Sequence, residues 1–412
     1  MGKVMEFLSG KVTLKQIFTS KGAWKKFWTD NAQKMRWAVL LNVQKTLNCK
    51  KVFGEHEYIC RTCKYIKKVA HTCKSRFCTS CGKASADKWA EKSLTCMLDT
   101  TYAHLFFTVP KEFREWSAYN RKAMLEIYFR AVRESILEHT KQRGYKPGII
   151  MVMHTFGADI KWVPHVHVMI TLGGLSLDNK KYIKKQRIYY NAIMPMFRYR
   201  FLKYFKEAFA SAGFVIPKSY SHIKTFKTFN SWLTKFYKIS WYVFLGKPLE
   251  EKDPVSKYLL RYSKRPVIAE SRIISCDDEY VVFEYFDKAL EEQKTAKMPT
   301  QTFIKRLVRH IPDCNFRMIR HAGIFANRVS TELTALARNF LGVAKKTGRK
   351  LSWRELMLKN YHVDPLKCPY CSKQMVLKDV AFGNVLGFRK NVWKQHESIL
   401  KENYGIAFTG FT

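Results

Sequence analysis

The chain has 412 residues, of which 47% are hydrophobic and 15% aromatic, and its 74 Lys and Arg against 33 Asp and Glu give a formal net charge of +41. The apolar fraction is large enough to build folded cores, so the composition excludes a disordered protein. A charge of this size indicates a polyanionic partner. We expect nucleic acid, because neutralised phosphates release counterions and so drive binding. A folded protein with a generally basic surface is the alternative.

The sequence contains no apolar run long enough for a transmembrane helix, which takes about 18 residues or more, so we expect no membrane partner. The N-terminus lacks the apolar core and the small-residue cleavage site of a signal peptide. We therefore expect a cytoplasmic protein whose 11 cysteines are thiols or metal ligands rather than a disulfide framework.

The predicted elements mix strands and helices at irregular intervals. Helical spacing in the first 50 residues leads into a cysteine-rich segment at 49–96. Strand patterns follow at 104–110, 148–156, 165–172, 241–246, 280–286 and 315–320, and helical patterns at 112–143, 187–211, 254–262 and 302–310. This mixture predicts an α+β domain over roughly 100–290, and the basic tail after 345 reads as a separate unit.

Two CxxC pairs carry the clearest metal signal. Cys60 and Cys63 form the first pair, and Cys78 and Cys81 form the second pair 14 residues later. Each pair can turn two thiolates toward one tetrahedral Zn²⁺, so we predict one structural zinc site made by these four residues. A group of small buried thiols is the alternative. Nearby donors that could replace one of the four are Cys73, His71 and His56.

A third pair, Cys368 and Cys371, stands alone near the C-terminus. One CxxC pair cannot fill a tetrahedral site, so zinc binding and a plain thiol turn both stay open for it.

A histidine pair falls on a predicted strand. His165 and His167 are two residues apart, so both imidazoles point to one face, about 7 Å apart, which suits chelation of one cation. A turn at Gly157 would pair this strand with the preceding one and bring His154 beside the pair, with Asp159 as the competing third ligand. Three protein ligands leave positions open for a phosphate oxygen. Ordinary sheet histidines are the alternative.

A tyrosine pair follows on a predicted helix. Tyr258 and Tyr262 are four residues apart and therefore share one helical face. Neighbouring cations favour a phenolate and attract phosphate, which makes the two phenols candidate nucleophiles. A core-packing aromatic pair is the alternative. The surrounding cations, which we expect to contact DNA, are Lys257, Arg261, Lys264 and Arg265.

A basic and aromatic stretch lies between these two motifs. Residues 179–249 contain 15 Lys and Arg, 19 aromatic residues and a single acid. Phosphates need cations and unstacked bases need aromatic platforms, so we predict a groove for single-stranded nucleic acid here. A helical core with solvated lysines is the alternative.

These motifs together resemble a known family. HTFGADIKWVPHVHVMITLGGL (154–175), KYLLRYSKRPVIAESRI (257–273), FIKRLVRHIP (303–312) and FRMIRHAGIFANR (316–328) are similar to segments of HUH-type rolling-circle transposases. The specific likeness is to two-tyrosine insertion-sequence transposases with an N-terminal zinc-binding region, which residues 60–92 resemble. The order of the motifs matches, and the resemblance covers roughly 50–330.

The resemblance implies both a fold and a chemistry. It implies an antiparallel sheet with the histidine pair on a central strand, flanking helices, Mg²⁺ or Mn²⁺ on His165 and His167, and nucleophilic Tyr258 and Tyr262. Relatives often carry a histidine two residues before the pair, where this chain has Val163, so His154 is our expected third ligand. The implied reaction nicks and rejoins single-stranded DNA at transposon ends and targets, in the bacterial nucleoid, through a 5′-phosphotyrosine that needs no ATP for rejoining.

The expected organisation has four parts. These are an N-terminal helical and zinc-binding DNA-contact domain (1–100), an HUH single-strand nuclease domain (101–290), a helical extension of the catalytic region (291–345) and a basic C-terminal region with a lone CxxC (346–412).

Three competing interpretations remain. A replication initiator or relaxase would share the nicking chemistry, and the N-terminal zinc region favours a transposase. A non-enzymatic zinc-finger DNA-binding protein would leave the histidine and tyrosine pairs unexplained. A histidine-triad nucleotide hydrolase needs a third histidine where this chain has Met169.

Overall fold

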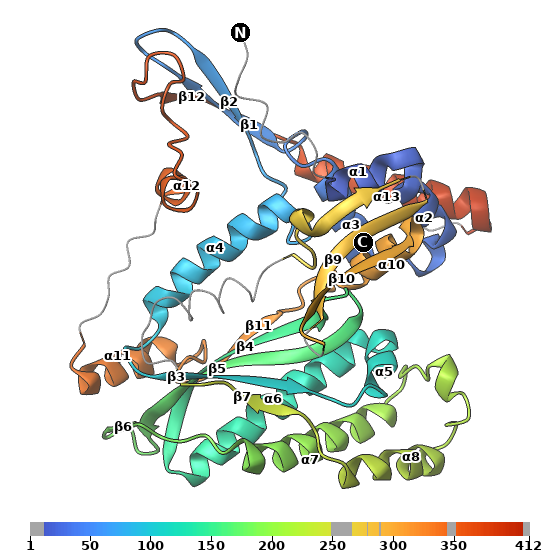
Figure 1. Ribbon diagram of the computed structural model, residues 1–412, viewed down its shortest axis with the longest axis vertical. Coiled ribbons are helices and arrows are strands. Elements are labelled where there is room, and N and C mark those ends of the chain that lie inside the picture. Colours follow the sequence, from blue (N-terminus) through green and yellow to red (C-terminus); the bar gives the residue numbers. More distant parts are fainter. Residues whose placement is uncertain (1–11, 249–265, 278, 288–289, 344–351, 407–412) are drawn as a thin grey trace.

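The computed structural model describes residues 12–248, 266–277, 279–287, 290–343 and 352–406 (Figure 1). Tyr258, Tyr262 and the four cations around them fall outside the described residues. The described part is α+β with antiparallel sheets, as predicted.

A six-stranded antiparallel sheet crosses the lower half of the molecule (Figure 1). Its strand order is β11-β4-β5-β3-β7, and β6 pairs with β5. The strands are β3 (Tyr102–Thr108), β4 (Tyr145–Phe156), β5 (Trp162–Ser176), β6 (Tyr182–Lys184), β7 (Val243–Leu245) and β11 (Ile319–Gly323). The β4–β5 hairpin is at its centre, and its turn closes where the Gly157 N–H donates to the Lys161 carbonyl at 3.1 Å. The two strands expected to pair therefore do so.

One face of this sheet is covered by helices. Side chains alternate along each strand, so Leu105, Met151 and Val168 enter one core together with the helices that lie below the sheet in Figure 1. Those helices are α5 (Phe113–Tyr119), α6 (Arg121–Gln142), α7 (Tyr190–Phe209) and α8 (Phe226–Lys238). The predicted long helix at 112–143 is thus two helices. They are divided at Asn120, whose side chain exchanges two hydrogen bonds of 2.7 Å with the backbone of Val215.

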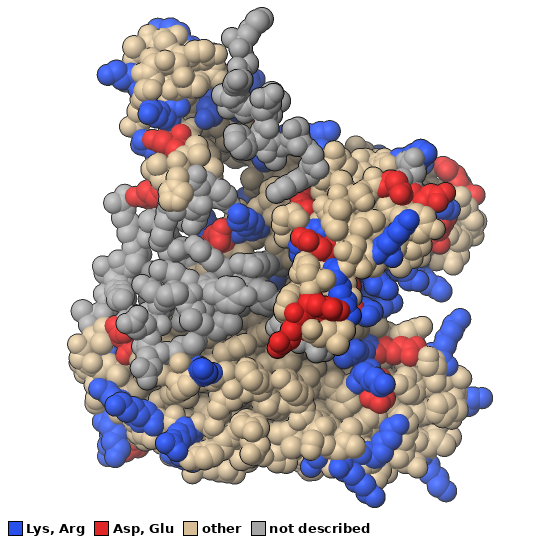
Figure 2. All heavy atoms as spheres, viewed as in Figure 1, with Lys and Arg blue, Asp and Glu red and all other residues tan. Residues whose placement is uncertain are grey.

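The predicted nucleic-acid groove at 179–249 contributes part of its side chains to the first core. Several of its aromatic side chains are fully or almost fully buried against the sheet and α6, because they supply the apolar faces of α7 and α8 and of the following turn. The buried rings are Phe197, Phe201, Phe205, Phe229, Phe236 and Trp241. Lys and Arg side chains project outward from this stretch, whereas acids lie over the β9–β10 hairpin and over the part of the molecule that holds α2 and α13 (Figure 2). The stretch therefore offers cations and several exposed rings, such as Tyr190, Tyr199 and Phe226, to a partner, and it keeps other rings inside.

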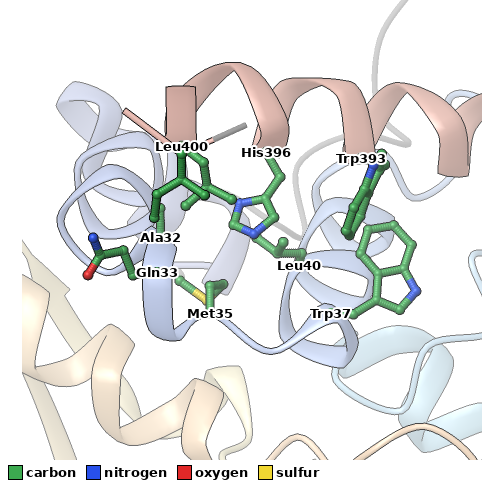
Figure 3. Close-up of a pocket in the computed structure, with 9 residues that line it drawn as sticks. Ala32, Gln33, Met35, Trp37, Leu40, Trp393, His396 and Leu400 are labelled. Atoms are coloured by element: carbon green, nitrogen blue, oxygen red, sulfur yellow. The ribbon is translucent and has the colours of Figure 1, made fainter. Parts of the chain in front are cut away.

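A second core joins the two ends of the chain. It contains α1 (Leu14–Thr19), α2 (Ala23–Asp30), α3 (Trp37–Leu47), β8 (Ile273–Cys276), β9 (Tyr280–Asp287), β10 (Glu292–Pro299), α10 (Thr300–Arg309) and α13 (Val385–Tyr404). Trp28 donates to His396 at 3.1 Å, and a pocket of about 510 Å³ remains between α3 and α13 (Figure 3). The expected boundaries at 100 and 290 therefore do not separate packing units.

A group of ion pairs connects the two cores. Asp313 pairs with Arg36, which precedes α3, and lies 3.7 Å from Arg121, the first residue of α6. The Arg121 guanidinium also lies over the Trp162 ring and donates to the Ile311 carbonyl at 3.1 Å. Burial lowers the pKa of Arg121 to about 9, so Asp313 compensates a charge that has lost most of its water.

The C-terminal region is not a separate unit, contrary to the sequence-based expectation. β12 (Val376–Phe382) pairs with β1 (Gly54–Ile59), which also pairs with β2 (Ile66–Ala70), so both ends of the chain share one small sheet. α12 (Trp353–Tyr361) lies beside this sheet in Figure 1. α4 (Thr79–Cys96) and α11 (Ser330–Leu341) contribute to a third core on the other face of the central sheet. None of the described helices is long and apolar enough to cross a membrane.

Candidate active site and cysteine clusters

Three histidines converge on the sheet face opposite α6 and α7. His154 on β4 is paired directly with His165 on β5, and His167 follows two residues later on the same face. The ring centroids are 5.5 Å apart for His154 and His165, 4.6 Å for His154 and His167, and 4.9 Å for His165 and His167. One ligand nitrogen from each ring lies within 4.8 Å of the others. The hairpin therefore builds a three-imidazole group suited to one cation.

A backbone contact orients one of these rings. His165 Nδ1 lies 2.7 Å from the carbonyl oxygen of Val163. A carbonyl can only accept, so Nδ1 carries the proton and Nε2 keeps its lone pair for a metal. Val163, at the position where relatives often have a histidine, thus serves the site through its backbone.

His104 on β3 is a fourth member that the sequence analysis missed. Its Nε2 lies 2.9 Å from His167 Nδ1, and the two rings stack with an interplanar angle of 9°. Such a contact fixes the ring that carries a metal ligand and raises its basicity. The available signal was the alternation of β3, which places His104 and Phe106 on one face, but the pairing of β3 with β5 was needed to bring them to the histidines.

Aromatic rings border the histidine group. Phe106 lies 4.8 Å from the His165 ring and 5.9 Å from the Tyr242 ring. Tyr242 is 58% exposed, and Phe244 on β7 is 47% exposed. Exposed rings beside a cation site can stack unpaired bases. Tyr242 and Phe244 belong to the predicted basic and aromatic stretch, and both are exposed near the histidines.

The other candidate for the third ligand, Asp159, lies in the hairpin turn. Asp159 pairs with Lys161 at 2.6 Å and accepts from its backbone N–H, so it caps the turn and is not in the histidine group. Beneath the turn, His310 contacts Thr155 Oγ1 and the Ile160 carbonyl, both at 3.0 Å. Burial lowers the pKa of His310 to about 4, so it is neutral and structural.

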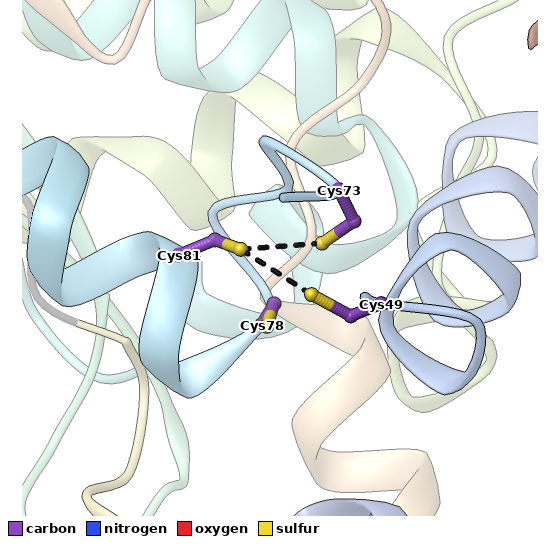
Figure 4. Close-up of side chains that lie close together, drawn as sticks. All are labelled: Cys49, Cys73, Cys78 and Cys81. Atoms are coloured by element: carbon purple, nitrogen blue, oxygen red, sulfur yellow. Dashed lines mark hydrogen bonds between the residues drawn. The ribbon is translucent and has the colours of Figure 1, made fainter. Parts of the chain in front are cut away.

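The first cysteine cluster lies at the base of the β1–β2 hairpin (Figure 4). It joins Cys49 after α3, Cys73 in a loop, Cys78 at the start of α4 and Cys81 in its first turn. Cys81 Sγ lies 3.5 Å from Cys49 Sγ and 3.6 Å from Cys73 Sγ. Sulfurs around a tetrahedral Zn²⁺ lie about 3.8 Å apart, so the geometry fits a structural zinc site.

The second cluster lies at the tip of the same hairpin and recruits the C-terminal pair. Cys60 Sγ is 3.3 Å from Cys371 Sγ, and Cys63 Sγ is 3.5 Å from Cys368 Sγ. The four ligand sulfurs again lie within 4.8 Å of one another.

The prediction that the two N-terminal pairs share one site is therefore wrong. Pairing of β1 with β2 carries Cys60 and Cys63 to the hairpin tip, while Cys78 and Cys81 stay near its base with Cys73, the extra candidate. Cys49 was missed altogether.

Charge explains why such clusters need a cation. Hydrogen bonds from Cys73 and Cys78 lower the pKa of Cys81 to about 2, and hydrogen bonds with Cys78 and Cys81 raise the pKa of Cys73 above the ordinary thiol value. A single thiolate is thus stabilised by its protonated neighbours. All four sulfurs can ionise together only when a cation offsets their repulsion, as zinc does.

Comparisons with known proteins agree with the motif order. A family model described as "Transposase zinc-binding domain" matches residues 19–109, and one described as "Putative transposase" matches residues 148–332. The transposase for insertion sequence element IS801 of Pseudomonas savastanoi pv. phaseolicola is 28% identical over 368 residues, 88% of each chain. "Putative transposase y4qJ" of Sinorhizobium fredii (strain NBRC 101917 / NGR234) is 25% identical over 345 residues, 81% of this chain and 87% of that protein. No solved structure gives a significant match.

Proposed function

We propose that the chain is an insertion-sequence transposase with an N-terminal zinc-binding domain, and that it nicks and rejoins single-stranded DNA by the rolling-circle route. The observation that carries this proposal is the convergence of His154, His165 and His167 on one sheet face. A protein that only binds DNA needs no group of three oriented imidazoles. A nuclease that polarises a phosphate needs such a group.

The histidines would hold one divalent cation through three nitrogens. A cation bound there supplies Lewis acidity at the scissile phosphate. Three protein ligands leave coordination positions for phosphate and water oxygens. Mg²⁺ prefers an all-oxygen environment, whereas Mn²⁺ accepts imidazole more readily, so we expect Mn²⁺ to support the reaction at lower concentration than Mg²⁺.

We assign the nucleophiles to Tyr258 and Tyr262. The phenol oxygen of one tyrosine attacks phosphorus and loses its proton, a tyrosine–phosphate bond forms, and the bond from phosphorus to the 3′-oxygen breaks. The leaving oxygen takes a proton and becomes a free 3′-OH, while the 5′-phosphate stays on the protein. The phosphodiester energy is conserved in the new ester, so the reverse attack by a 3′-OH rejoins a strand.

Two nucleophiles suit strand exchange. One tyrosine can hold the first 5′ end while the other cuts a second strand, which allows donor and target to be joined crosswise. The cations Lys257, Arg261, Lys264 and Arg265 would hold the phosphates, and the exposed rings of Tyr242 and Phe244 would stack unpaired bases.

A replication initiator or relaxase would use the same chemistry. The zinc-binding domain and the transposase relatives favour transposition. A non-enzymatic zinc-finger protein is disfavoured because it leaves the histidine group without a role.

The test is a cleavage assay on labelled single-stranded DNA carrying the ends of the element. We expect cleavage that requires Mn²⁺ or Mg²⁺, stops with a chelator, and does not occur on the same sequence as a duplex. Binding without cleavage under all metal conditions would support the zinc-finger alternative and overturn the proposal.

A further inference from the structure

Four cysteines from the two ends of the chain meet at the tip of the small sheet. Cys60 and Cys63 follow β1, Cys368 and Cys371 precede β12, and no part of the second pair lies within the matched zinc-binding region, residues 19–109. We propose that these four thiolates bind a second structural zinc ion, which ties the C-terminal segment to the N-terminal hairpin and completes one zinc ribbon. This site is independent of the nicking chemistry.

The two CxxC turns have the same backbone structure. The Cys60 N–H donates to the carbonyl five residues later at 2.9 Å, and its carbonyl accepts from the N–H four residues later at 2.9 Å. Cys368 makes the equivalent bonds with Lys373 and Ser372 at 2.9 and 3.0 Å. The residue four positions after the first cysteine is left-handed in both turns, with φ of 59° at Lys64 and 60° at Ser372.

Such a turn directs backbone N–H groups at the first sulfur. The backbone N–H groups of Cys63 and Thr62 donate to the Cys60 sulfur. The backbone N–H groups of Cys371 and Tyr370 donate in the same way to the Cys368 sulfur. Two unrelated stretches of sequence thus form matching halves of a four-thiolate site. A chance meeting of buried thiols would not produce this symmetry.

The apolar core of the tip is small. Among the described residues, its cluster contains three buried members, Cys60, Cys368 and Met375. Other contacts there include the pairing of β1 with β12, an edge-on pair of Tyr65 and Tyr370 at 4.8 Å and a 2.9 Å bond from Lys67 to the Pro365 carbonyl. A structure with so small a core usually needs a metal or disulfides to stay folded.

Two disulfides are the chemical alternative, because Cys60 faces Cys371 and Cys63 faces Cys368. Disulfides would require only these two pairwise approaches. The structure instead brings all four sulfurs within 4.8 Å of one another, close to the mutual spacing of about 3.8 Å around a tetrahedral zinc ion. The convergence therefore favours one metal over two bridges.

The test measures zinc per chain in the purified full-length protein and in cysteine-to-serine variants. We expect two zinc ions in the parent and in the control Cys314→Ser, an exposed cysteine outside both clusters. Cys60→Ser and Cys371→Ser should each lose one ion, and the double variant should lose the same single ion. Cys60→Ser/Cys78→Ser should lose both.

A second measurement needs no variant. Chelation should make Cys60, Cys63, Cys368 and Cys371 react together with an alkylating reagent, read by mass spectrometry of peptides. Two zinc ions retained in Cys371→Ser would overturn the proposal. So would a loss of only one ion in Cys60→Ser/Cys78→Ser, or C-terminal cysteines that resist alkylation until a reductant is added. None of these measurements involves DNA cleavage, so failure of the zinc site and failure of the proposed function are distinguishable.

Discussion

His154 on β4 lies directly opposite His165 on β5, and their rings are 5.5 Å apart. The pairing depends on a five-residue turn whose Ile160 is left-handed, with φ of 55°. Because register in a hairpin is set by its turn, a one-residue slip in register would move every side chain of one strand to the opposite sheet face. The turn therefore brings His154, His165 and His167 together as one group of three nitrogen ligands.

The variant His165→Ala should reduce single-strand cleavage by at least about 100-fold, because the cation loses one of three protein ligands. DNA binding, measured by fluorescence anisotropy, should change little, since the expected phosphate contacts lie elsewhere. His222→Ala, at an exposed histidine outside the group, is the matched control and should cleave normally. Normal cleavage by His165→Ala would exclude this residue as a ligand.

His104→Ala tests the contact that orients His167. The substitution removes the 2.9 Å partner of His167 Nδ1, so we expect the Mn²⁺ concentration for half-maximal cleavage to rise about 10- to 100-fold. His104→Gln retains a hydrogen-bonding side chain and should recover part of the loss. An unchanged metal requirement in His104→Ala would show that the stacking is only structural.

His310 makes the stability of the hairpin depend on pH. Its pKa is about 4 in the folded protein, against an ordinary 6.5, so between these values the unfolded chain takes up a proton that the folded chain does not. Stability is therefore lost as pH falls from 6.5 to 4, by about 3 kcal/mol from this residue. Thermal unfolding of the parent and of His310→Gln should diverge less at pH 4.5 than at pH 7. A constant difference would contradict the assignment.

Zinc removal tests the first cysteine cluster. Cys73→Ser deletes one ligand of the group that joins α3 to α4, and structural zinc contributes directly to folding. We expect loss of one zinc ion and a melting temperature lower by about 5 °C or more. Cys276→Ser, at a cysteine outside both clusters, should change neither quantity. A zinc-free Cys73→Ser protein with parental stability would rule out a structural role.

The histidine group could be predicted from the sequence because its information is local. Alternation places His165 and His167 on one face, and a single turn brings His154 beside them. His104 needed the pairing of β3 with β5, which brings it to His167, 63 residues later, and leaves no local pattern.

The cysteine sites could be predicted only as zinc-binding in general. Their partition depends on the β1–β2 hairpin and on a partner segment that is more than 300 residues away for Cys60 and Cys371. The spacing of the cysteines along the sequence favoured one site made by the two nearest CxxC pairs. The aromatic residues of 179–249 could not be divided from the sequence for a related reason: the same rings suit base stacking and core packing, and packing against the sheet decides which of them are buried.

The central claim is covalent catalysis by the tyrosines, and its most direct test is a single-turnover reaction on end-labelled single-stranded DNA followed by denaturing electrophoresis. The parent should give a protein–DNA adduct that survives denaturation and maps to Tyr258 or Tyr262 by mass spectrometry. Tyr258→Phe/Tyr262→Phe should bind the same strand with unchanged affinity and form no adduct, while Tyr242→Phe, a control phenol beside the histidines, should form it normally. An adduct of parental yield in the double variant would place the nucleophile elsewhere and contradict the account.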